Sequence, residues 1–207
     1  MAQRETGLFR LLGASWAYQG FQDLLGAETF RRRLATWIDA APGHRVLDIG
    51  CGPAQILAHL PAGIEYHGFD DSAAYIATAR ARWGERGTFW QARVEHATLD
   101  ELGRFDRVIA IGVLHHLDDD AAGGLMALAA AALAPGGMLL TYDPCWAAGQ
   151  GLLARSLIER DRGADVRDAH GYAALARAHF ADVSPQVISG HLRVPYTAAV
   201  LRCRSAS

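Results

Sequence analysis

Two glycines and an acid near residue 50 form the pattern with the clearest chemistry in the sequence. Asp48 is followed by Gly50, Cys51 and Gly52, and the apolar residues before them favour a buried strand. Because glycine has no Cβ, the backbone can turn sharply there and approach a ligand closely. A helix that begins near Ala54 would add unpaired amide donors at its N-terminus. The pattern therefore predicts a cradle for a nucleotide-type ligand.

Two other nucleotide-binding patterns do not match. A dinucleotide-binding turn has the spacing G-x-G-x-x-G, and Gln55 occupies the position of its third glycine. A P-loop requires a lysine, whereas all 20 basic residues of this chain are arginines. The lack of lysine also excludes a lysine Schiff base. The distinctive feature that remains is an acid two residues before the first glycine.

The stretch Asp48–Gly52 resembles the first motif of class I S-adenosylmethionine (SAM) dependent methyltransferases. Asp70, Leu114–Leu117 and Pro135–Gly137 support the resemblance, which extends over about 42–203. It implies a Rossmann-like α/β fold: a doubly wound, seven-stranded sheet with a terminal antiparallel strand, helices on both faces and an N-terminal helical cap. It also implies SAM as the cofactor.

Under this resemblance, the ribose diol of SAM needs an acceptor at the end of the second strand. Asp70 lies 18 residues after Gly52, close to the spacing of about 20 residues for the ribose acid of dinucleotide folds. Asp71 is a competing ribose ligand, and Asp70 could instead cap the next helix. We therefore expect Asp70 or Asp71 to bind the ribose.

The adenine contact departs from the family pattern. The family has an acidic residue in a Gly-Asp-Ala-like triplet after the third strand, and Arg93 stands in that position here. Three alternatives remain open at this stage: Arg93 stacks on the ring, Val94 offers its backbone amide, or Glu95 substitutes for the missing acid.

The ends of the fourth and fifth strands supply the candidate catalytic residues. Gly112 would let the backbone approach the methionine portion of SAM. His115, from the Leu-His-His-Leu motif, could accept a proton from the acceptor, because its ordinary pKa of about 6.5 is near the working pH. It could equally position the cofactor or cap the following helix. Asp143 could bind an acceptor amine or hydroxyl, or cap the next segment.

The elements that must position these residues can be read from apolar spacing. Residues 1–41 show three- and four-residue periodicity and predict helices, which either pack as a cap or form a lid. As a lid they would bring Tyr18, a candidate catalytic residue, and Gln22, a candidate cofactor ligand, to the pocket. From residue 42, strands alternate with helices, as in parallel α/β folds. Strands are expected at 45–49, 66–70, 88–92, 105–113, 138–142, 182–189 and 194–203, and helices at 54–60, 72–83, 98–102, 119–133, 151–160 and 170–180.

Length and composition bound the remaining expectations. The 207 residues suit one domain, with 1–41 as helical lid, 42–142 as SAM-binding core and 143–207 as acceptor-side segment and closing strands. A net charge of −2 gives no basic field for nucleic acid or acidic lipid. Three scattered cysteines show neither metal spacing nor a disulfide framework. No signal peptide or membrane-spanning run is expected, so we predict a cytoplasmic protein without a metal, its oligomeric state undetermined.

The resulting hypothesis is a SAM-dependent transferase that methylates a small molecule, such as a sugar, a lipid-linked intermediate or a natural-product precursor, by in-line displacement. One alternative uses SAM alone: an enzyme of the same fold could cyclise it to azetidine-2-carboxylate and methylthioadenosine. Another alternative is a non-catalytic SAM-binding protein.

Overall fold

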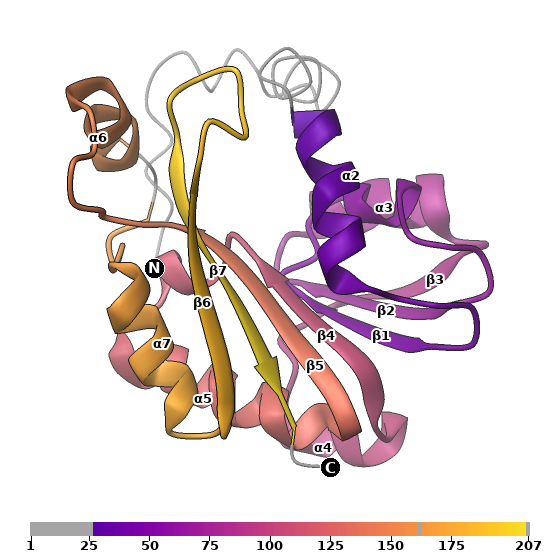
Figure 1. Cartoon of the computed structure of the whole chain (residues 1–207). Helices are drawn as coiled ribbons and strands as arrows, with labels where there is room; N and C mark the ends of the chain where they lie inside the picture. The colour runs from indigo at the N-terminus through magenta and orange to yellow at the C-terminus, as the bar shows by residue number, and fades with distance from the viewer. Residues whose placement is uncertain (1–26, 161–162, 206–207) are drawn as a thin grey trace.

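The computed structural model describes residues 27–160 and 163–205. Seven strands form one sheet in the order β3-β2-β1-β4-β5-β7-β6 (Figure 1). Strands β1 to β5 are parallel, and β7 runs antiparallel to both β5 and β6. The predicted doubly wound sheet with a terminal antiparallel strand is confirmed. The strands are β1 (Arg45–Ile49), β2 (Glu65–Asp70), β3 (Gly87–Gln91), β4 (Phe105–Ile111), β5 (Leu133–Pro144), β6 (Asp182–Ser189) and β7 (Thr197–Arg204).

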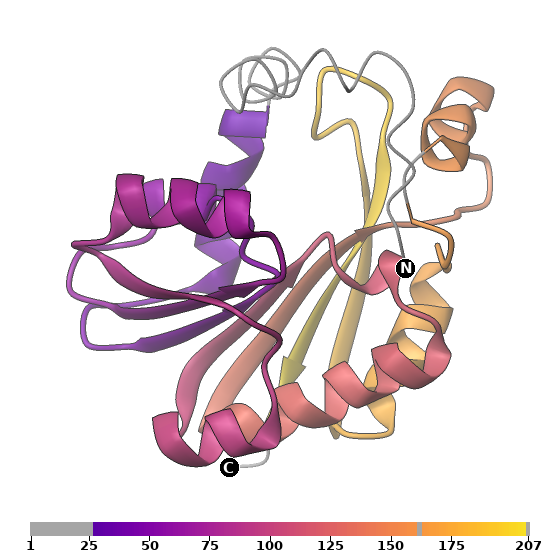
Figure 2. The ribbon, with the colours of Figure 1, turned by 180° about the vertical axis from the view of Figure 1, so that it is seen from behind.

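Helices cover both faces of this sheet, as expected. The apolar residues of α2 and α3 pack on one face, and those of α4, α5 and α7 pack on the other (Figure 2). Helix α6 stands at the rim beside the tip of the β6–β7 hairpin (Figures 1 and 2). The helices are α2 (Ala27–Ile38), α3 (Ala73–Trp83), α4 (His96–Leu102), α5 (Asp119–Ala132), α6 (Leu152–Glu159) and α7 (Ala169–Arg177), with short 3₁₀ turns η2 (Gln55–Ala58) and η3 (Leu114–His116).

Side-chain caps explain where three of the helices begin. The Ser72 hydroxyl accepts a hydrogen bond from the third residue of α3, and the carboxylates of Asp118 and Asp168 do the same for α5 and α7. Such caps satisfy amides that have no partner within the helix. They set the direction in which each helix crosses back over the sheet.

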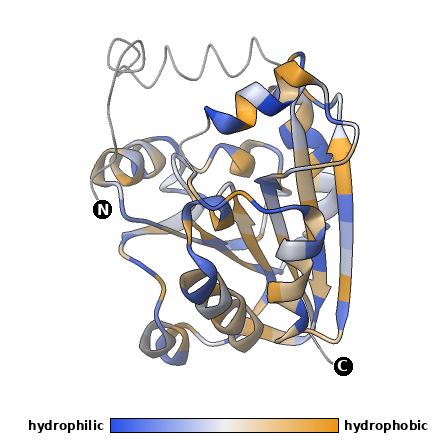
Figure 3. Ribbon diagram, turned by 90° about the vertical axis from the view of Figure 1, so that its left-hand side faces the viewer, coloured by the Kyte–Doolittle hydropathy of each residue, from blue (hydrophilic) through white to orange (hydrophobic). Residues whose placement is uncertain are grey.

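Hydrophobic residues concentrate along the central strands, between the two helical layers (Figure 3). β1, β4 and β5 carry fully buried residues that point alternately to the two faces: Val46, Ile109 and Leu140 to the α2 side, and Leu47, Val108 and Leu139 to the α5 side. Burial on both faces is typical of parallel strands with helical crossovers.

The expected helix over 54–60 is wrong. The chain leaves the glycine turn through Ala54, whose φ of 52° is left-handed, and continues as the four-residue turn η2. Its hydrogen bonds span three residues, for example from the Leu57 amide to the Ala54 carbonyl. Where the sequence predicts an α-helix of seven residues, the structure therefore has only this short 3₁₀ turn.

Several strand boundaries also differ from the sequence expectation; β7, for example, begins at Thr197 instead of residue 194. β5 begins at Leu133 instead of Met138, because Pro135–Gly137 lies within a bulge that shifts the register against β4. β4 ends at Ile111 instead of residue 113, because Gly112 turns the chain with a φ of 71°. This early end places η3 directly over the carboxyl edge of the sheet.

Residues 1–26, with Tyr18 and Gln22, lie outside the residues that the structure describes, so the lid over 1–41 stays a prediction apart from α2. The division at residues 42 and 143 is likewise a prediction. Within the described ranges, every helix is too short or too polar to cross a membrane.

Candidate active site

The glycine turn joins the ends of β1 and β2. The amides of Gly50 and Cys51 both donate to the carbonyl of Phe69, over 2.8 and 2.9 Å. Gly50 has a φ of 73°, and a Cβ there would come within 2.6 Å of the Val113 side chain. In contrast, a Cβ at Gly52 would meet no atom within 4 Å. The turn therefore needs glycine at its first position for packing, and it faces open space at its second.

Asp70 connects this turn to the end of β2. One carboxylate oxygen accepts from the Gly52 amide over 2.9 Å, and the other accepts from the Ser72 amide over 2.8 Å. Each carboxylate oxygen has two lone pairs, so Asp70 retains capacity for further donors such as a diol. The structure thus brings Gly50, Gly52 and Asp70 together at the carboxyl edge, as the sequence predicts.

Asp71 and Arg93 form an exposed ion pair beside Asp70. The Arg93 guanidinium lies 2.9 Å from the Asp71 carboxylate, and this pair raises the pKa of Arg93 further. The Asp71 side chain is 58% exposed and the Arg93 side chain is 81% exposed. The pairing of Asp71 with Arg93 leaves Asp70 as the better placed of the two ribose candidates. The side chain of Val94 packs against the core on the α5 side.

Asp48 lies beneath the turn and not on its surface. Its side chain is 2% exposed, and the Tyr66 hydroxyl donates a hydrogen bond to it. Burial raises the pKa of Asp48 to about 7, although the Tyr66 bond opposes this shift. The neighbouring Cys51 thiol is also buried, and burial together with Asp48 and Asp70 raises its pKa far above the usual range. Cys51 therefore stays an unreactive thiol.

His115 and Asp143, which lie 28 residues apart in the sequence, form a buried pair. His115 Nδ1 lies 2.8 Å from an Asp143 carboxylate oxygen, which also accepts from the His115 amide over 3.2 Å. Asp143 is 1% exposed, and burial raises its pKa despite the histidine. Its other carboxylate oxygen has no partner among the described residues. The pair fastens η3 to the end of β5.

The segment 163–168, directly before α7, covers this pair and is called the roof below. The Asp165 amide donates to the His115 carbonyl over 3.1 Å. Arg167 donates to the carbonyls of Leu114 and Leu117 and pairs with Asp119. His115 is consequently 5% exposed. The ring lies in the interior of the protein and not at an open mouth.

A further polar pair lies on the opposite face of β5 and was not identified from the sequence. The Tyr142 hydroxyl and His191 Nε2 are 2.9 Å apart, and the Phe30 ring packs on both side chains. Local sequence could indicate only that Tyr142 and Asp143 face opposite sides of a strand. The partner of Tyr142 comes from the hairpin loop 49 residues later.

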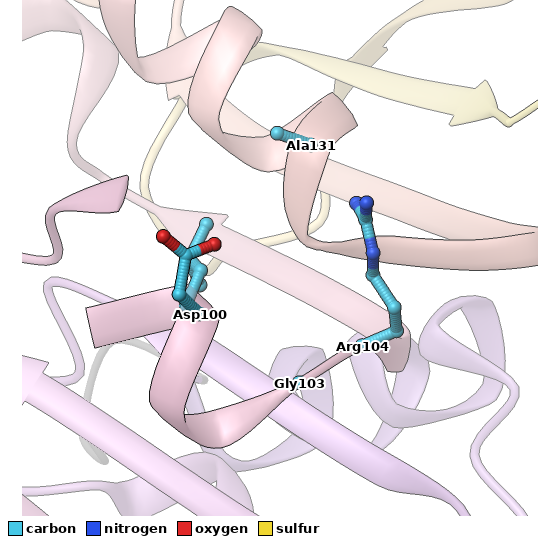
Figure 4. A pocket seen from close by; sticks show the side chains of 5 residues that line it. Asp100, Gly103, Arg104 and Ala131 are labelled. Atoms are coloured by element: carbon cyan, nitrogen blue, oxygen red, sulfur yellow. The ribbon is translucent and has the colours of Figure 1, made fainter. Parts of the chain in front are cut away.

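The cavity in Figure 4 does not belong to this site. It has a volume of about 210 Å³ and lies between Asp100 and Arg104, where the chain enters β4 (Figure 4). That is the amino end of the parallel strands, whereas ligands of open α/β sheets bind at the carboxyl ends. No group of three or more potential metal ligands occurs among the described residues.

Comparison with known proteins agrees with this geometry. A family model described as "Methyltransferase domain" matches residues 47–139. An uncharacterised protein of Synechococcus is 37% identical over 102 residues, which cover 46% of this chain and 24% of that protein. A tRNA U34 carboxymethyltransferase of Idiomarina loihiensis is 35% identical over 94 residues, which cover 41% of this chain and 28% of that protein. The chain thus spans only about a quarter of the length of these curated relatives.

Solved structures share the fold over almost the whole chain. Magnesium protoporphyrin IX methyltransferase from Synechocystis, with bound S-adenosylhomocysteine (SAH), has a TM-score of 0.69 at 19% identity and covers 90% of this chain and 87% of that chain. Phosphoethanolamine N-methyltransferase 2 of Haemonchus contortus has a TM-score of 0.71 at 15% identity, and the match covers 97% of this chain and 59% of that chain. Residues 47–139 therefore match the methyltransferase domain model, and the chain shares the fold of these SAM-dependent methyltransferase structures, as the Asp48–Gly52 motif predicts.

Proposed function

We propose that this protein transfers a methyl group from SAM to a small-molecule acceptor by in-line displacement. The observation that carries the proposal is the junction of the glycine turn with Asp70, at the carboxyl edge of a domain that matches methyltransferases. The open space before Gly52 fits a ligand held against the turn.

Each part of the cofactor has a proposed partner. The backbone of Gly50, Cys51 and Gly52 would lie against SAM at the turn, and Gly112 would border its methionine portion. Asp70 would accept hydrogen bonds from the ribose diol. Asp71, Arg93 and Val94 would border the adenine side. From the N-terminal region, Gln22 is a further predicted cofactor contact and Tyr18 a predicted catalytic residue. Asp48 would support the turn from below.

The chemistry requires little from the protein beyond orientation. SAM supplies a sulfonium leaving group, and placing an acceptor in line with its methyl carbon can lower the barrier by about 7–11 kcal/mol. In this proposal, the His115–Asp143 pair fixes η3, and with it the backbone beside Gly112 that borders the reacting centre. Asp143 holds the imidazole orientation, and the role of His115 and Asp143 in this proposal is to position η3 beside the reacting centre.

A small-molecule acceptor is supported by two observations. A net charge of −2 provides no basic field for a nucleic acid. Two of the structural neighbours are, by their titles, methyltransferases of magnesium protoporphyrin IX and of a phosphoethanolamine. The match to the tRNA-modifying relative covers only 28% of that protein. This short match gives no support for tRNA as the substrate of the present chain.

Substitution of Asp70 tests this assignment. Asp70→Asn keeps the shape but loses a charged acceptor, and hydrogen bonds to charged groups are worth about 1.5–3 kcal/mol. We expect the SAM dissociation constant from titration calorimetry to rise at least about tenfold. The matched control is Asp71→Asn, next along the chain and exposed, which should change the dissociation constant less than threefold, that is, by under about 0.7 kcal/mol. Equal effects of the two substitutions would contradict the role of Asp70.

Product analysis separates methyl transfer from the other use of SAM. Purified protein incubated with SAM and no acceptor should leave methylthioadenosine at the level of a protein-free blank. Mass spectrometry with added acceptors should detect SAH together with a methylated product. Methylthioadenosine well above the blank would replace methyl transfer by cyclisation of SAM.

A further inference from the structure

The end of β5 presents a polar side chain to each face of the sheet. Asp143 faces α5 and α7 and pairs with the buried His115, whereas Tyr142 faces α2 and pairs with His191. The Tyr142 carbonyl also accepts from the Gly112 amide over 2.7 Å. The Tyr142–His191 pair is therefore one hydrogen bond from the strand end at which the methionine portion of SAM is proposed to lie.

Three distant segments meet at His191. Its ring centroid is 4.6 Å from that of Phe30 on α2 and 6.3 Å from that of Tyr196 in the hairpin loop. Tyr142 supports it from β5. An aromatic wall of this kind provides apolar contact area with few polar groups, as in small-molecule sites.

One nitrogen of His191 has no role within the described protein. Nε2 contacts Tyr142, but Nδ1 is shielded from water and has no hydrogen-bond partner among the described residues. A buried polar atom without a partner costs stability, so such an atom calls for an explanation. Burial and the nearby Arg33 lower the pKa of His191 to about 4. The ring is therefore neutral at neutral pH, and a ligand meets an uncharged imidazole there.

We propose that His191 Nδ1 binds the hydroxyl group of the methyl acceptor, that Tyr142 positions the imidazole, and that the acceptor is a neutral hydroxyl-bearing small molecule. This inference rests on the methyl transfer proposed above. With the Nε2–H donated to the Tyr142 oxygen, Nδ1 is purely an acceptor and requires an O–H or a neutral N–H donor, of which we propose the O–H. A carboxylate offers no proton, and an ammonium group would face Arg33. In this proposal, the loop 190–196 between β6 and β7, which has no strand pairing, moves to admit the acceptor to the shielded Nδ1.

The transfer balances with these groups. The acceptor oxygen forms a bond to the methyl carbon while the carbon–sulfur bond breaks, and the electron pair of that bond remains on sulfur. The hydroxyl proton passes to His191 Nδ1, and it is released to water once the product has left and water reaches that nitrogen. Because the pKa of His191 is low, the imidazolium releases this proton readily.

Two substitutions of His191 distinguish substrate binding from simple packing. Asn places an acceptor near the former Nδ1 but cannot reach Tyr142, whereas Gln places one near the former Nε2 and keeps that contact. If Nδ1 binds the acceptor, His191→Gln should lower kcat/KM about 100-fold, and His191→Asn should lower it less. If His191 serves only to hold Tyr142 in place, kcat/KM should fall more in the Asn variant than in the Gln variant, because Gln retains the bond to Tyr142. Tyr142→Phe keeps the ring and should raise KM more than it lowers kcat.

The assay uses three aromatic probes of similar size: p-cresol, p-toluidine and p-toluate, each with SAM. We expect methylation of p-cresol, with SAM affinity in calorimetry unchanged within twofold in every variant. The SAM affinity distinguishes failure of this inference from failure of the proposed function. A protein that does not bind SAM contradicts the proposed function, whereas a protein that binds SAM without methylating p-cresol bears on His191. Methylation of only the amine or the carboxylate, or the reverse ranking of the Asn and Gln variants, would overturn the proposal.

Nitrogen NMR of the SAH-loaded protein gives a readout without turnover. The His191 signals should show a protonated Nε2 and an unprotonated Nδ1, and saturating p-cresol should shift the Nδ1 signal. An Nδ1-protonated tautomer, or no shift of Nδ1 at saturation, would overturn the proposal even if none of the three probes is methylated.

Discussion

Asp48 belongs to the glycine motif, but its carboxyl group is buried and lowers the stability of the fold. It begins the glycine motif, yet the fold places its carboxyl group in the interior against Tyr66. A buried carboxylate is costly, so the folded protein holds a proton there at a pH where the unfolded chain does not. The acid that identifies the motif in the sequence is therefore a stability cost in the structure.

This cost predicts a pH dependence of unfolding. The pKa of Asp48 rises from 3.8 to about 7 on folding. Between these values the folded state binds the extra proton, so its contribution to stability falls as pH rises from about 4 to 7 and then levels off. Asp48→Asn removes this group. Its free energy of unfolding, relative to the natural protein, should rise by about 1 kcal/mol or more over that range.

Urea unfolding at several pH values between 4.5 and 7.5 measures this difference. Asp71→Asn is the control, because its carboxylate is exposed, and its stability should run parallel to that of the natural protein. A constant offset between the Asp48→Asn variant and the natural protein across the range would show that the carboxyl group titrates normally.

At the scale of elements, the segment before α7 determines the environment of the His115–Asp143 pair. Gly163 lies so close to His115 that a Cβ would come within 2.1 Å of the ring and 2.5 Å of the carbonyl. Because one of these atoms belongs to the backbone, the contact cannot be relieved by moving a side chain alone. The absence of a side chain at residue 163 is thus a condition for closing the roof.

Gly163→Ala should separate the roof from η3. We expect a loss of about 1–3 kcal/mol in unfolding free energy, typical of an overpacked interior, and a lower rate of methyl transfer. Gly124→Ala is the control: a Cβ on this exposed residue of α5 meets no atom within 4 Å, and alanine in a helix should add about 0.5–1 kcal/mol. A Gly163→Ala protein as stable and active as the natural one would show that the roof does not bear on the site.

At the scale of the whole molecule, the three cysteines report on the integrity of the sheet. Cys51, Cys145 and Cys203 are free and buried at three places in the domain. Burial raises the pKa of Cys145 and of Cys203 to about 12. Only the thiolate is reactive, so these groups are protected twice, by access and by protonation.

Iodoacetamide labelling should therefore follow global unfolding. At pH 8 the folded protein should show no carbamidomethylation in intact-mass spectra, and all three cysteines should react together once urea unfolds the domain. A single site that labels in the folded state would identify a region that opens independently, and peptide mapping would locate it.

The sequence by itself determined the fold class, and it predicted where the cofactor cradle lies. The alternation of strands and helices predicted six of the seven strands to within a few residues, and only the turn within β5 concealed the true start of that strand. The spacing from Gly52 to Asp70 was also sufficient, because both residues stand at ends of neighbouring parallel strands. Such information is local: it resides in periodicity, in turn residues and in short distances along the chain.

Only the tertiary structure decided which side chains meet. His115 contacts Asp143 across 28 residues, and Tyr142 contacts His191 across 49. No local pattern encodes these contacts, because they depend on the order of β4, β5 and β7 in the sheet and on the face to which each residue points. The left-handed Ala54, which replaces the expected helix by η2, is likewise set by how the turn packs against its neighbours. The motif locates the cradle, and long-range packing positions the groups around it.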